Sequence, residues 1–442
     1  MSVLFEFHNT VEVGEPNALK DYLHRVWNEH YAKLINEETD YEKENNKLYQ
    51  PFLSFDGNNI RARNYVGFIQ FNNNHIEIYP KVFKEQPANS KQILQHLFFW
   101  FDYCRKWKFP FTKSKLDTLE NIDMPELIIY LMASKMLEIV SEQPIALYEQ
   151  VEESLYTPRG RINFSRYLSS GFVRGNQHII ECDYEPFVFD NRLNRVIKYT
   201  SRLLLNKTKF TENQNILQEL IVILDEVNDQ PCSYYDLESV VLSPLFEAYL
   251  NVVDICKIVL QNLMYSNQQY DLSQWSLLFP MEYVFEDFIA GFLENKFSSK
   301  WKVEYQKSNM NLSSHPEAFN MQHDIFLTSR NDKTKSIIID TKYKLRDGNF
   351  KDDKKRNIAQ QDMYQMVSYA LRRGCNNVLI LYPNIGESIN KADTFIIKSG
   401  FPGQDEISIT AAEVPFWSLG NIKELPEKLY IHLSEILKKY EQ

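Results

Sequence analysis

The stretch that most constrains the fold is KSIIIDTKY at residues 335–343, where three consecutive isoleucines lead directly into Asp340, Thr341 and Lys342. A β-branched apolar run of this kind is typical of a buried strand. Successive strand residues point to opposite faces, so Asp340 and Lys342 project from the same face. A strand that simply ends at the surface would also explain two charges, so this stretch alone leaves a structural and a functional interpretation open.

A second strand is predicted just upstream, at MQHDIFLT (321–328), and the turn-rich segment SRNDKTK separates it from the isoleucine strand. If the two strands form a hairpin centred near Asp332, Asp324 faces Asp340. Directly opposed residues have Cβ atoms about 4.5–5.5 Å apart. Two carboxylates this close repel each other unless a cation lies between them. The hairpin therefore predicts a cation site.

Oxygen atoms dominate the predicted site, and hard divalent cations such as Mg²⁺ prefer carboxylate, carbonyl and water oxygens. The hairpin supplies Asp324, Asp340 and the main-chain carbonyl of Thr341. The predicted helix MEYVFEDFIAGFLENKF (281–297) can add a carboxylate from Glu286 or, as second choice, Glu282, which lie one turn apart. The alternative is that both glutamates are surface residues of an amphipathic helix.

Three further polar residues can act beside this predicted cation site. Lys342 can orient or deprotonate a water, or stabilise charge on a phosphate. Gln361 and Gln365, one turn apart on a helix predicted at 356–374, can contact water or the DNA backbone, although both also suit a plain helix surface.

The overall composition indicates a protein of two or three domains without membrane segments. The chain has 442 residues, of which 44% are hydrophobic and 24% charged. No apolar run approaches the roughly 20 residues that a membrane helix needs. The first residues, MSVLFEFHNTVEVGEPNALK, lack the basic start of a signal peptide, so we expect a cytoplasmic protein.

The cysteines and the net charge exclude other classes of protein. The five cysteines are scattered and form no CxxC pair, which argues against a disulfide framework and a zinc site. A net charge of −10 argues against non-specific DNA binding by the whole surface. Basic residues do gather locally: residues 342–356 hold seven basic and three acidic residues, and the segment RGRINFSRYLSSGFVRGN begins at Arg159. The first run suits either a phosphate-facing surface or a solvated loop, and the second suits either contact with a partner or DNA, or a plain loop.

The pattern along the chain predicts an α+β multidomain protein with three regions. Residues 1–120 form a mixed β/α region, with a hairpin at 64–82 and a helix at 90–107. Residues 121–265 are mainly helical, with helices at 121–148, 189–206 and 243–263. Residues 266–442 run in the order helix (281–297), three strands (301–307, 321–328, 335–343), helix (356–374, stopped by Gly374) and strand (376–383), with a further strand at 393–398.

Residues 281–383 resemble the PD-(D/E)xK nuclease superfamily, with Asp324 as the first motif acid and DTK (340–342) as the second motif. Most of the chain resembles the McrC-like subunits of McrBC 5-methylcytosine-dependent restriction systems. The stretches that carry this resemblance are GFIQFNNNHIEIYPKV (67–82), RGRINF (159–164), FDNRLNRVIKYT (189–200), MEYVFEDF (281–288), HDIFL (323–327), IIDTKYK (338–344) and QQDMYQMVSYA (360–370). One departure is His323, which stands where the nuclease motif has proline.

The resemblance implies a function that one chain does not perform alone. McrC-like proteins are the DNA-cleaving partners of McrB-like AAA+ GTPase hexamers, so it implies Mg²⁺-dependent cleavage of double-stranded DNA, with an N-terminal half that engages the motor and a C-terminal restriction-endonuclease-like domain. By carry-over, Asp324, Asp340 and Lys342 take the catalytic positions and Glu286 is the helix acid. The sequence contains no GxxxxGK[ST] phosphate loop, which agrees with a motor supplied by another subunit.

Two other functions remain open. An autonomous RecB-like nuclease would cut DNA without a GTPase, although many such enzymes carry an iron–sulfur cluster that these scattered cysteines do not suit. A non-cleaving activator of an AAA+ motor would leave the Asp324, Asp340 and Lys342 set without a role.

Overall fold

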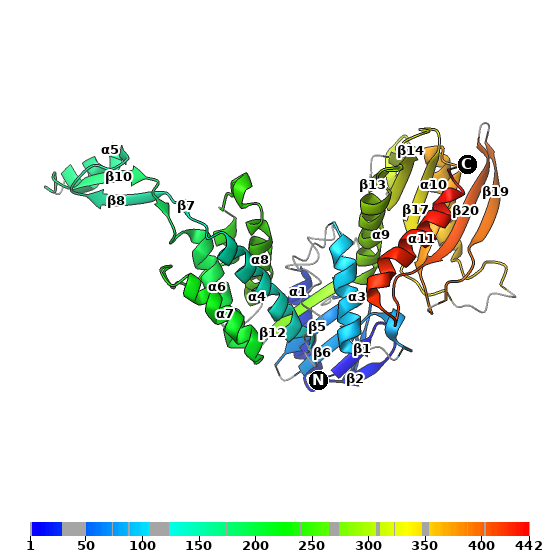
Figure 1. The fold of residues 1–442 in the computed structure, drawn as a ribbon, viewed down its shortest axis with the longest axis horizontal. Helices are drawn as coiled ribbons and strands as arrows, with labels where there is room; N and C mark the ends of the chain where they lie inside the picture. The colour runs from blue at the N-terminus through cyan, green and yellow to red at the C-terminus, as the bar shows by residue number, and fades with distance from the viewer. Residues whose placement is uncertain are drawn as a thin grey trace. The chain divides into compact units, whose positions relative to one another are not determined.

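The computed structural model of the chain describes residues 2–28, 50–72, 74–86, 89–105, 123–172, 175–238, 240–264, 274–305, 310–321, 323–346, 353–386, 388–401 and 404–441. The chain divides into two compact units (Figure 1). The first unit combines Met1–Met124 with Ser276–Gln442, and the second is Pro125–Trp275. The region predicted at 1–120 and most of the region predicted at 266–442 therefore lie together in the first unit, which takes up the chain again at Ser276.

The N-terminal part of the first unit is built on a four-stranded sheet with strand order β1-β6-β5-β12. Its strands are β1 (Ser2–Phe5), β6 (Asn74–Tyr79), β5 (Tyr65–Phe71) and β12 (Gln274–Pro280). β5 and β6 pair antiparallel, which confirms the hairpin predicted at 64–82. Gly67 has φ of +135°, and a Cβ atom there would lie 1.9 Å from the carbonyl oxygen of Leu277, so only glycine lets β12 approach this closely.

Smaller elements complete this part of the unit. A three-stranded sheet has the order β2-β4-β3, and α1 and α3 each bury several apolar side chains. The bounds are β2 (Thr10–Glu12), β3 (Leu53–Asp56), β4 (Asn59–Ala62), α1 (Pro16–Val26), η3 (Lys81–Phe83) and α3 (Ser90–Tyr103). α3 begins with a capping box in which Asn89 and Gln92 bond each other's backbone N–H groups, and its position confirms the helix predicted from residue 90.

The C-terminal part of the first unit is a six-stranded sheet with order β13-β16-β17-β18-β20-β19. β17 pairs antiparallel with β16 and parallel with β18, so it lies between two neighbours, as an uninterrupted isoleucine run predicts. The strands are β13 (Trp301–Tyr305), β16 (Ile325–Ser329), β17 (Ser336–Thr341), β18 (Asn377–Pro383), β20 (Gln404–Val414) and β19 (Asp393–Phe401).

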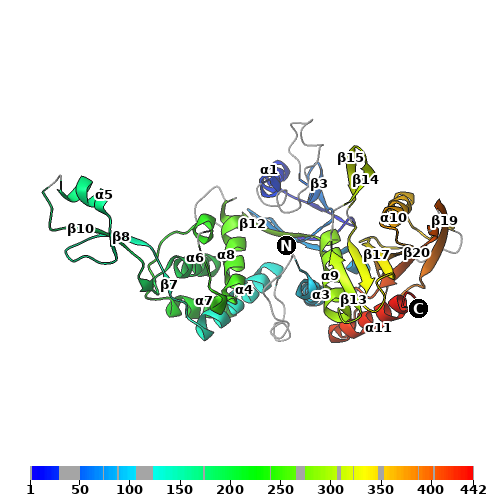
Figure 2. The same cartoon turned by 90° about the horizontal axis from the view of Figure 1, so that it is seen from above.

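Helices cover both faces of this sheet. α10 (Gln360–Arg373) and α11 (Leu425–Lys438) lie on opposite faces (Figure 2). Ile338 and Ile380 pack with Met366 of α10 in one core cluster. α9 (Met281–Phe297) contacts β13 and β17 and has the bounds predicted for it. Gly374 ends α10 in the left-handed conformation with φ of 62°, as predicted.

Some elements of the first unit differ from the predicted pattern. A hairpin of β14 (Met310–Ser314) and β15 (Glu317–Met321) precedes β16, so the strand predicted at 321–328 spans the end of β15 and most of β16. β20, α11 and the short η9 (Ile422–Glu424) were not expected from the sequence pattern. The mixed α/β class is confirmed.

The second unit is mainly helical, as predicted. Its helices are α4 (Met124–Glu142), α6 (Arg192–Lys207), α7 (Thr211–Ile223) and α8 (Tyr249–Met264), with short turns η6 (Tyr234–Leu237) and η7 (Pro244–Phe246). The core side chains come from all of these helices; examples are Met132, Val196, Leu220 and Val252. α7 was missed by the periodicity analysis.

The second unit also carries a β-rich arm, which extends away from α6, α7 and α8 (Figure 1). The arm consists of β7 (Leu147–Tyr148), β8 (Val151–Leu155), β9 (Arg161–Ile162), α5 (Phe164–Arg166), a π-helix (Tyr167–Phe172), β10 (Ile180–Tyr184) and β11 (Phe187–Val188). The described residues of the basic segment that begins at Arg159 lie in this arm. Arg166 pairs with Glu181 at 3.0 Å, and the Arg159 guanidinium lies 4.8 Å from the centre of the Tyr184 ring.

Two expectations about the chain's class can be compared with the structure. All five cysteines are free, as expected. Among the helices of the described ranges, none is long and apolar enough to cross a membrane.

Candidate active site

The register of β16 and β17 sets the geometry of the site. Ile325 pairs with Ile339 and Phe326 with Ile338. The same register places Asp324, the residue before β16, opposite Asp340 near the end of β17. This is the facing arrangement that the turn around Asp332 predicts.

Asp324 is fixed by Thr341. Its Oδ2 accepts a hydrogen bond from the Thr341 backbone N–H at 2.7 Å and another from the Thr341 hydroxyl at 2.8 Å. Burial raises the pKa of the Asp324 carboxyl, while these bonds and the nearby Lys342 ammonium lower it. Because the N–H and C=O of one strand residue point to the same side, the Thr341 carbonyl also faces this edge.

Asp340 is fixed by Lys342. The Asp340 side chain is almost completely buried, and its Oδ2 lies 2.8 Å from the Lys342 Nζ. Burial and the charge of Asp324 raise the pKa of Asp340 to about 7, although Lys342 opposes both. Burial alone would lower the pKa of Lys342, but the carboxylates of Asp340 and Asp324 outweigh burial and raise it. The raised pKa favours the ammonium form of Lys342, which suits orientation of a water and charge stabilisation.

α10 adds two side chains to this face of the sheet. The Gln365 Oε1 lies 3.5 Å from the Lys342 Nζ, and the Gln365 Nε2 donates a hydrogen bond to the Tyr369 hydroxyl at 2.8 Å. Asp362 is buried, and its charge contributes to the raised pKa of Asp340. Gln361, predicted as a site residue, is exposed on α10 next to Asp362. Asp362 was missed, although an acid in line with Met366 and Tyr369 on the apolar side of a helix is a usable signal.

The two glutamates of α9 have different surroundings. Burial raises the pKa of the Tyr305 hydroxyl, and the charges of Glu286, Asp287 and Asp324 raise it further, so Glu286 and Asp324 both lie near this phenol. Glu282 is exposed, and its charge acts on Glu6, Lys81 and Tyr343 instead. The structure therefore favours Glu286 over Glu282 as the α9 acid closer to Asp324.

The chemical type of the donor atoms near Asp324 and Asp340 suits a hard cation. It consists of two facing carboxylates and the Thr341 carbonyl, all oxygen donors of the type that Mg²⁺ prefers. The mutual repulsion that raises the pKa of Asp340 is the interaction that a bound cation would offset. Within the described ranges, no three Asp, Glu, His or Cys side chains lie close enough together to hold a metal.

Comparison with known proteins shows the family to which the chain belongs. A family model described as McrBC 5-methylcytosine restriction system component matches residues 60–383, which is more than half of the chain. The chain belongs to this family. The matched range includes Asp324, Asp340 and Lys342.

One solved structure shares the fold of this McrBC-family chain, and a second was also matched. A chain from the Thermococcus gammatolerans assembly of McrB AAA+ hexamers with bound McrC is 19% identical, with a TM-score of 0.68 over 98% of this chain and 99% of that chain. A chain from the Thermococcus gammatolerans McrBC complex is 21% identical over 67% of this chain and 88% of that chain, with a TM-score of 0.48. A comparison with curated proteins found no match.

His323, the residue before Asp324, has a packing role in this McrBC-family chain. It is buried, its ring packs edge-on against Phe326 with centroids 5.7 Å apart, and its Nε2 lies 3.4 Å from an Arg373 nitrogen. These contacts hold the His323 ring next to Asp324.

Some cations of the basic run at 342–356 pair with acidic side chains of the protein itself. The Lys344 Nζ lies 3.2 Å from Asp362, and the Arg346 guanidinium, 1% exposed, lies 2.8 Å from Asp393 and 5.2 Å from the Tyr382 ring centre. The buried Arg346 therefore does not present a phosphate-facing surface, whereas the Lys344 side chain is exposed beside Asp362. Residues 347–352 of the run lie outside the described residues.

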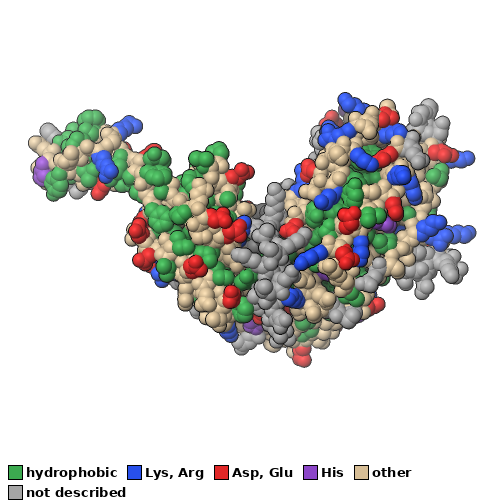
Figure 3. Space-filling model, viewed as in Figure 1, with side chains coloured by type: hydrophobic (Ala, Val, Ile, Leu, Met, Phe, Trp, Pro, Cys, Tyr) green, Lys and Arg blue, Asp and Glu red, His purple; other side chains and the backbone are tan. Residues whose placement is uncertain are grey.

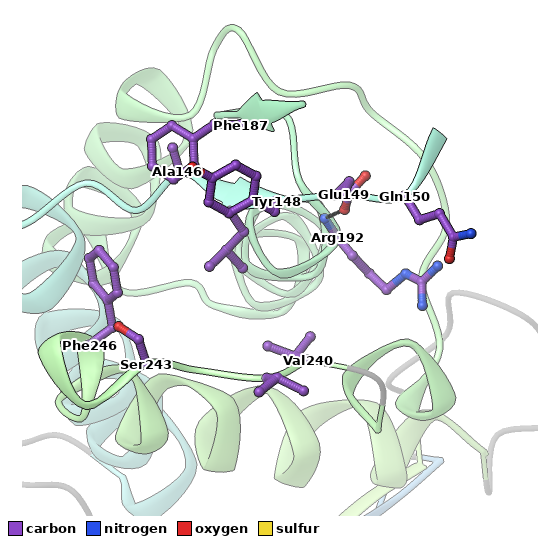
Figure 4. Close-up of a pocket in the computed structure, with 11 residues that line it drawn as sticks. Ala146, Tyr148, Glu149, Gln150, Phe187, Arg192, Val240, Ser243 and Phe246 are labelled. Carbon is purple, nitrogen blue, oxygen red and sulfur yellow. Dashed lines mark hydrogen bonds between the residues drawn. The ribbon is translucent and has the colours of Figure 1, made fainter. Parts of the chain in front are cut away.

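A separate pocket of about 610 Å³ lies in the second unit (Figure 4). It is lined by Tyr148 of β7 and Phe187 of β11, whose ring centroids are 5.1 Å apart, and by Val240 and Phe246. Glu149 of this pocket accepts a hydrogen bond from the Arg192 backbone N–H and lies 3.4 Å from the Arg195 guanidinium. Among the described residues that line this pocket, none is a predicted site residue.

Proposed function

We propose that this chain is the DNA-cleaving subunit of a modification-dependent restriction complex, a type IV restriction endonuclease that hydrolyses double-stranded DNA with Mg²⁺. The observation that carries the proposal is the facing pair Asp324 and Asp340 with Lys342 on the same strand face. A four-strand core of β16, β17, β18 and β20 with α9 and α10 around it is compatible with a PD-(D/E)xK nuclease domain.

The proposed mechanism assigns each residue a role that its contacts support. Asp324 and Asp340, with the Thr341 carbonyl, would hold Mg²⁺, which when bound supplies Lewis-acid activation of water and charge neutralisation at the phosphate. The two bonds from Thr341 keep the Asp324 carboxylate in one orientation. The Lys342 ammonium positions the attacking water and stabilises negative charge that develops on the phosphate. Glu286, the α9 acid closer to Asp324, would add a further carboxylate to the cation site.

The proposed partner is an McrB-like AAA+ GTPase hexamer. Family membership supports this partner, and the sequence contains no phosphate loop of its own for nucleotide hydrolysis. A motor that brings modified DNA to the nuclease also explains how an acidic chain acts on DNA. On the face shown in Figure 3, Lys and Arg side chains are frequent over α9 and β14 of the first unit, although the whole chain has a net charge of −10. Cleavage of DNA by such a complex is expected in the cytoplasm.

The deciding experiment is cleavage of 5-methylcytosine-containing plasmid DNA with Mg²⁺ and GTP, by this chain alone and with the neighbouring AAA+ GTPase. Cutting only in the mixture is expected. Asp340→Ala should reduce cutting at least 1,000-fold and leave GTPase stimulation intact, because it removes a cation ligand without touching the described contacts of the second unit. Asp21→Ala, at an exposed position of α1, is the matched control and should cut normally.

Each alternative predicts a different result in the same assay. Cutting by the chain alone would favour the autonomous nuclease. GTPase stimulation without cutting, by wild type and Asp340→Ala alike, would favour the non-cleaving activator. Normal cutting by Asp340→Ala would exclude the proposed site.

A further inference from the structure

A second cluster of buried charged groups lies directly beside the proposed active site. Glu6 follows β1, and Lys81 begins η3 after β6; β1 and β6 are parallel neighbours, so the two residues meet at the same edge of the N-terminal sheet. Glu6 is 1% exposed, and its Oε2 accepts the backbone N–H of Lys81 at 2.9 Å. The cluster therefore ties together two strand ends of the N-terminal sheet.

Glu6 and Lys81 both contact Tyr343, the residue that follows Lys342. The Lys81 Nζ donates to the Tyr343 carbonyl at 2.7 Å and lies 4.0 Å from the centre of the Tyr343 ring. The Tyr343 hydroxyl donates to the Glu6 Oε2 at 2.9 Å. The ring itself is buried against Phe285 of α9 and Phe416, with centroids about 6 Å away. The main chain, the ring and the hydroxyl of Tyr343 are therefore all held.

Lys342 needs such an anchor because the strand that carries it has ended. β17 ends at Thr341, and the Lys342 N–H makes a last bond to the Leu381 carbonyl at 2.8 Å. The next backbone bond, from the Lys344 N–H to the Lys342 carbonyl at 2.7 Å, is a local turn and not a sheet contact. Beyond the strand, the direction of the Lys342 side chain thus depends on how the Tyr343 backbone is fixed.

We propose that Lys81 and Glu6 are positioning residues of the nuclease, which hold Lys342 against Asp340 through Tyr343. The inference rests on the proposed function, because it assigns Lys342 its role in cleavage. It makes the edge of the N-terminal sheet part of the catalytic machinery. A positioning contact of this kind affects the rate of the chemical step more than the affinity for DNA, because neither residue is assigned a contact with DNA.

The test compares Lys81→Met, which keeps the length of the side chain but loses the ammonium, with Lys81→Arg, which keeps a cation. Lys84→Met is the matched control, because Lys84 lies in the same turn and pairs with the exposed Glu85. In the complete complex at saturating DNA, Lys81→Met should cut at least tenfold more slowly with half-saturating DNA unchanged within twofold. Lys81→Arg should cut at a rate within threefold of wild type. Lys84→Met should cut at the wild-type rate.

Amide hydrogen exchange provides a measurement that does not depend on cleavage. Lys81→Met should accelerate exchange at least tenfold in residues 342–344 and leave Ile337–Ile339 unchanged. Tyr343→Phe keeps the ring and removes the bond to Glu6, so it should show a smaller change in the same residues, even if Lys81→Met fails to fold. Wild-type exchange in both variants, or wild-type cutting by Lys81→Met, would overturn the inference.

Failure of the two proposals can be told apart. If wild type cuts and Asp340→Ala does not, the proposed function stands whatever Lys81→Met does. If wild type does not cut under any condition, the proposed function fails, and the exchange of residues 342–344 alone decides whether Lys81 holds this segment.

Discussion

Asp324 and Asp340 face each other, yet the protein stabilises the two carboxylates by different means. Asp324 accepts two hydrogen bonds from Thr341, whereas Asp340 pairs with the Lys342 ammonium. Burial raises the pKa of both. Replacing each residue therefore removes a different kind of interaction, and the loss can be measured separately from activity.

Asp324→Ala should destabilise the first unit more than Asp324→Asn. Alanine leaves the Thr341 N–H without an acceptor, which costs about 1–3 kcal/mol for a buried donor. Asparagine keeps an oxygen and removes the repulsion with Asp340, so its free energy of unfolding should stay within about 1 kcal/mol of wild type. Urea unfolding followed by tryptophan fluorescence measures both, and equal destabilisation by the two variants would contradict the role given to the Thr341 bonds. Both variants should fail to cut DNA.

Glu6 predicts a pH dependence of stability. The pKa of the Glu6 carboxyl is raised from the ordinary value of 4.5 to about 7, mainly by burial. The charge of Glu282 also raises this pKa, whereas Lys81 and the hydrogen bond from Tyr343 lower it. The folded state thus holds this proton more tightly than the unfolded state, so the stabilisation is complete below pH 4.5 and is lost as the pH rises through 7.

Glu6→Gln removes this titration. Between pH 4.5 and 8, the stability of wild type should therefore fall relative to Glu6→Gln by about 3 kcal/mol. Measuring the free energy of unfolding of both proteins across this range isolates Glu6 from the other titrating groups. A difference that does not change with pH would show that the Glu6 carboxyl titrates normally.

At the scale of elements, α9 shows how a contact between helices overrides helix propensity. Gly291 lies within α9, where replacement of glycine by alanine normally stabilises a helix by about 1 kcal/mol. A Cβ atom at Gly291 would lie 1.8 Å from the carbonyl oxygen of Tyr103, the last residue of α3. The two helices approach this closely only because position 291 has no side chain.

Gly291→Ala should therefore destabilise the first unit, by about 1–3 kcal/mol or more, because the backbone of Tyr103 must move. Gly14→Ala is the control, because a Cβ there meets nothing within 4 Å. Thermal unfolding of both variants measures the effect. A higher melting temperature for Gly291→Ala would mean that α3 and α9 do not cross at this position.

At the scale of the whole molecule, the N-terminal and C-terminal parts of the chain share one unit. Trp100 of α3 stacks on Phe416 with centroids 3.9 Å apart, and its Nε1 donates to the Phe416 carbonyl at 2.8 Å. His96 of the same helix accepts the Ser418 N–H at 3.1 Å. The region predicted at 266–442 therefore buries part of its surface on residues 1–105.

Expressed alone, residues 276–442 should not reach a compact native state, because the surface that α3 covers would be exposed to water. We expect binding of a hydrophobic dye and non-cooperative melting, and recovery on co-expression with residues 1–124. Residues 125–275 have their own core and should melt cooperatively as an isolated fragment. A cooperative, dye-free transition of 276–442 alone would contradict the shared unit.

The sequence by itself predicted the elements whose residues repeat at short range. The isoleucine strand, the hairpin at 64–82 and the helix at 281–297 follow from local periodicity, and the turn around Asp332 was enough to place Asp324 opposite Asp340. A hairpin register depends on neighbours in sequence, which is why the pair at the proposed active site could be found without a structure. The roles of these residues remain a proposal.

The tertiary structure alone decided which distant residues surround that pair. Glu6 and Lys81 reach Tyr343 across more than 250 residues of sequence, and no periodic pattern marks such a contact. The β-rich arm escaped prediction because short strands with exposed side chains lack a clear alternation, and α7 was missed as well. Local signals arise from the period of a helix or a strand, whereas contacts between elements depend on how buried surfaces fit together, and only the folded chain brings those surfaces together.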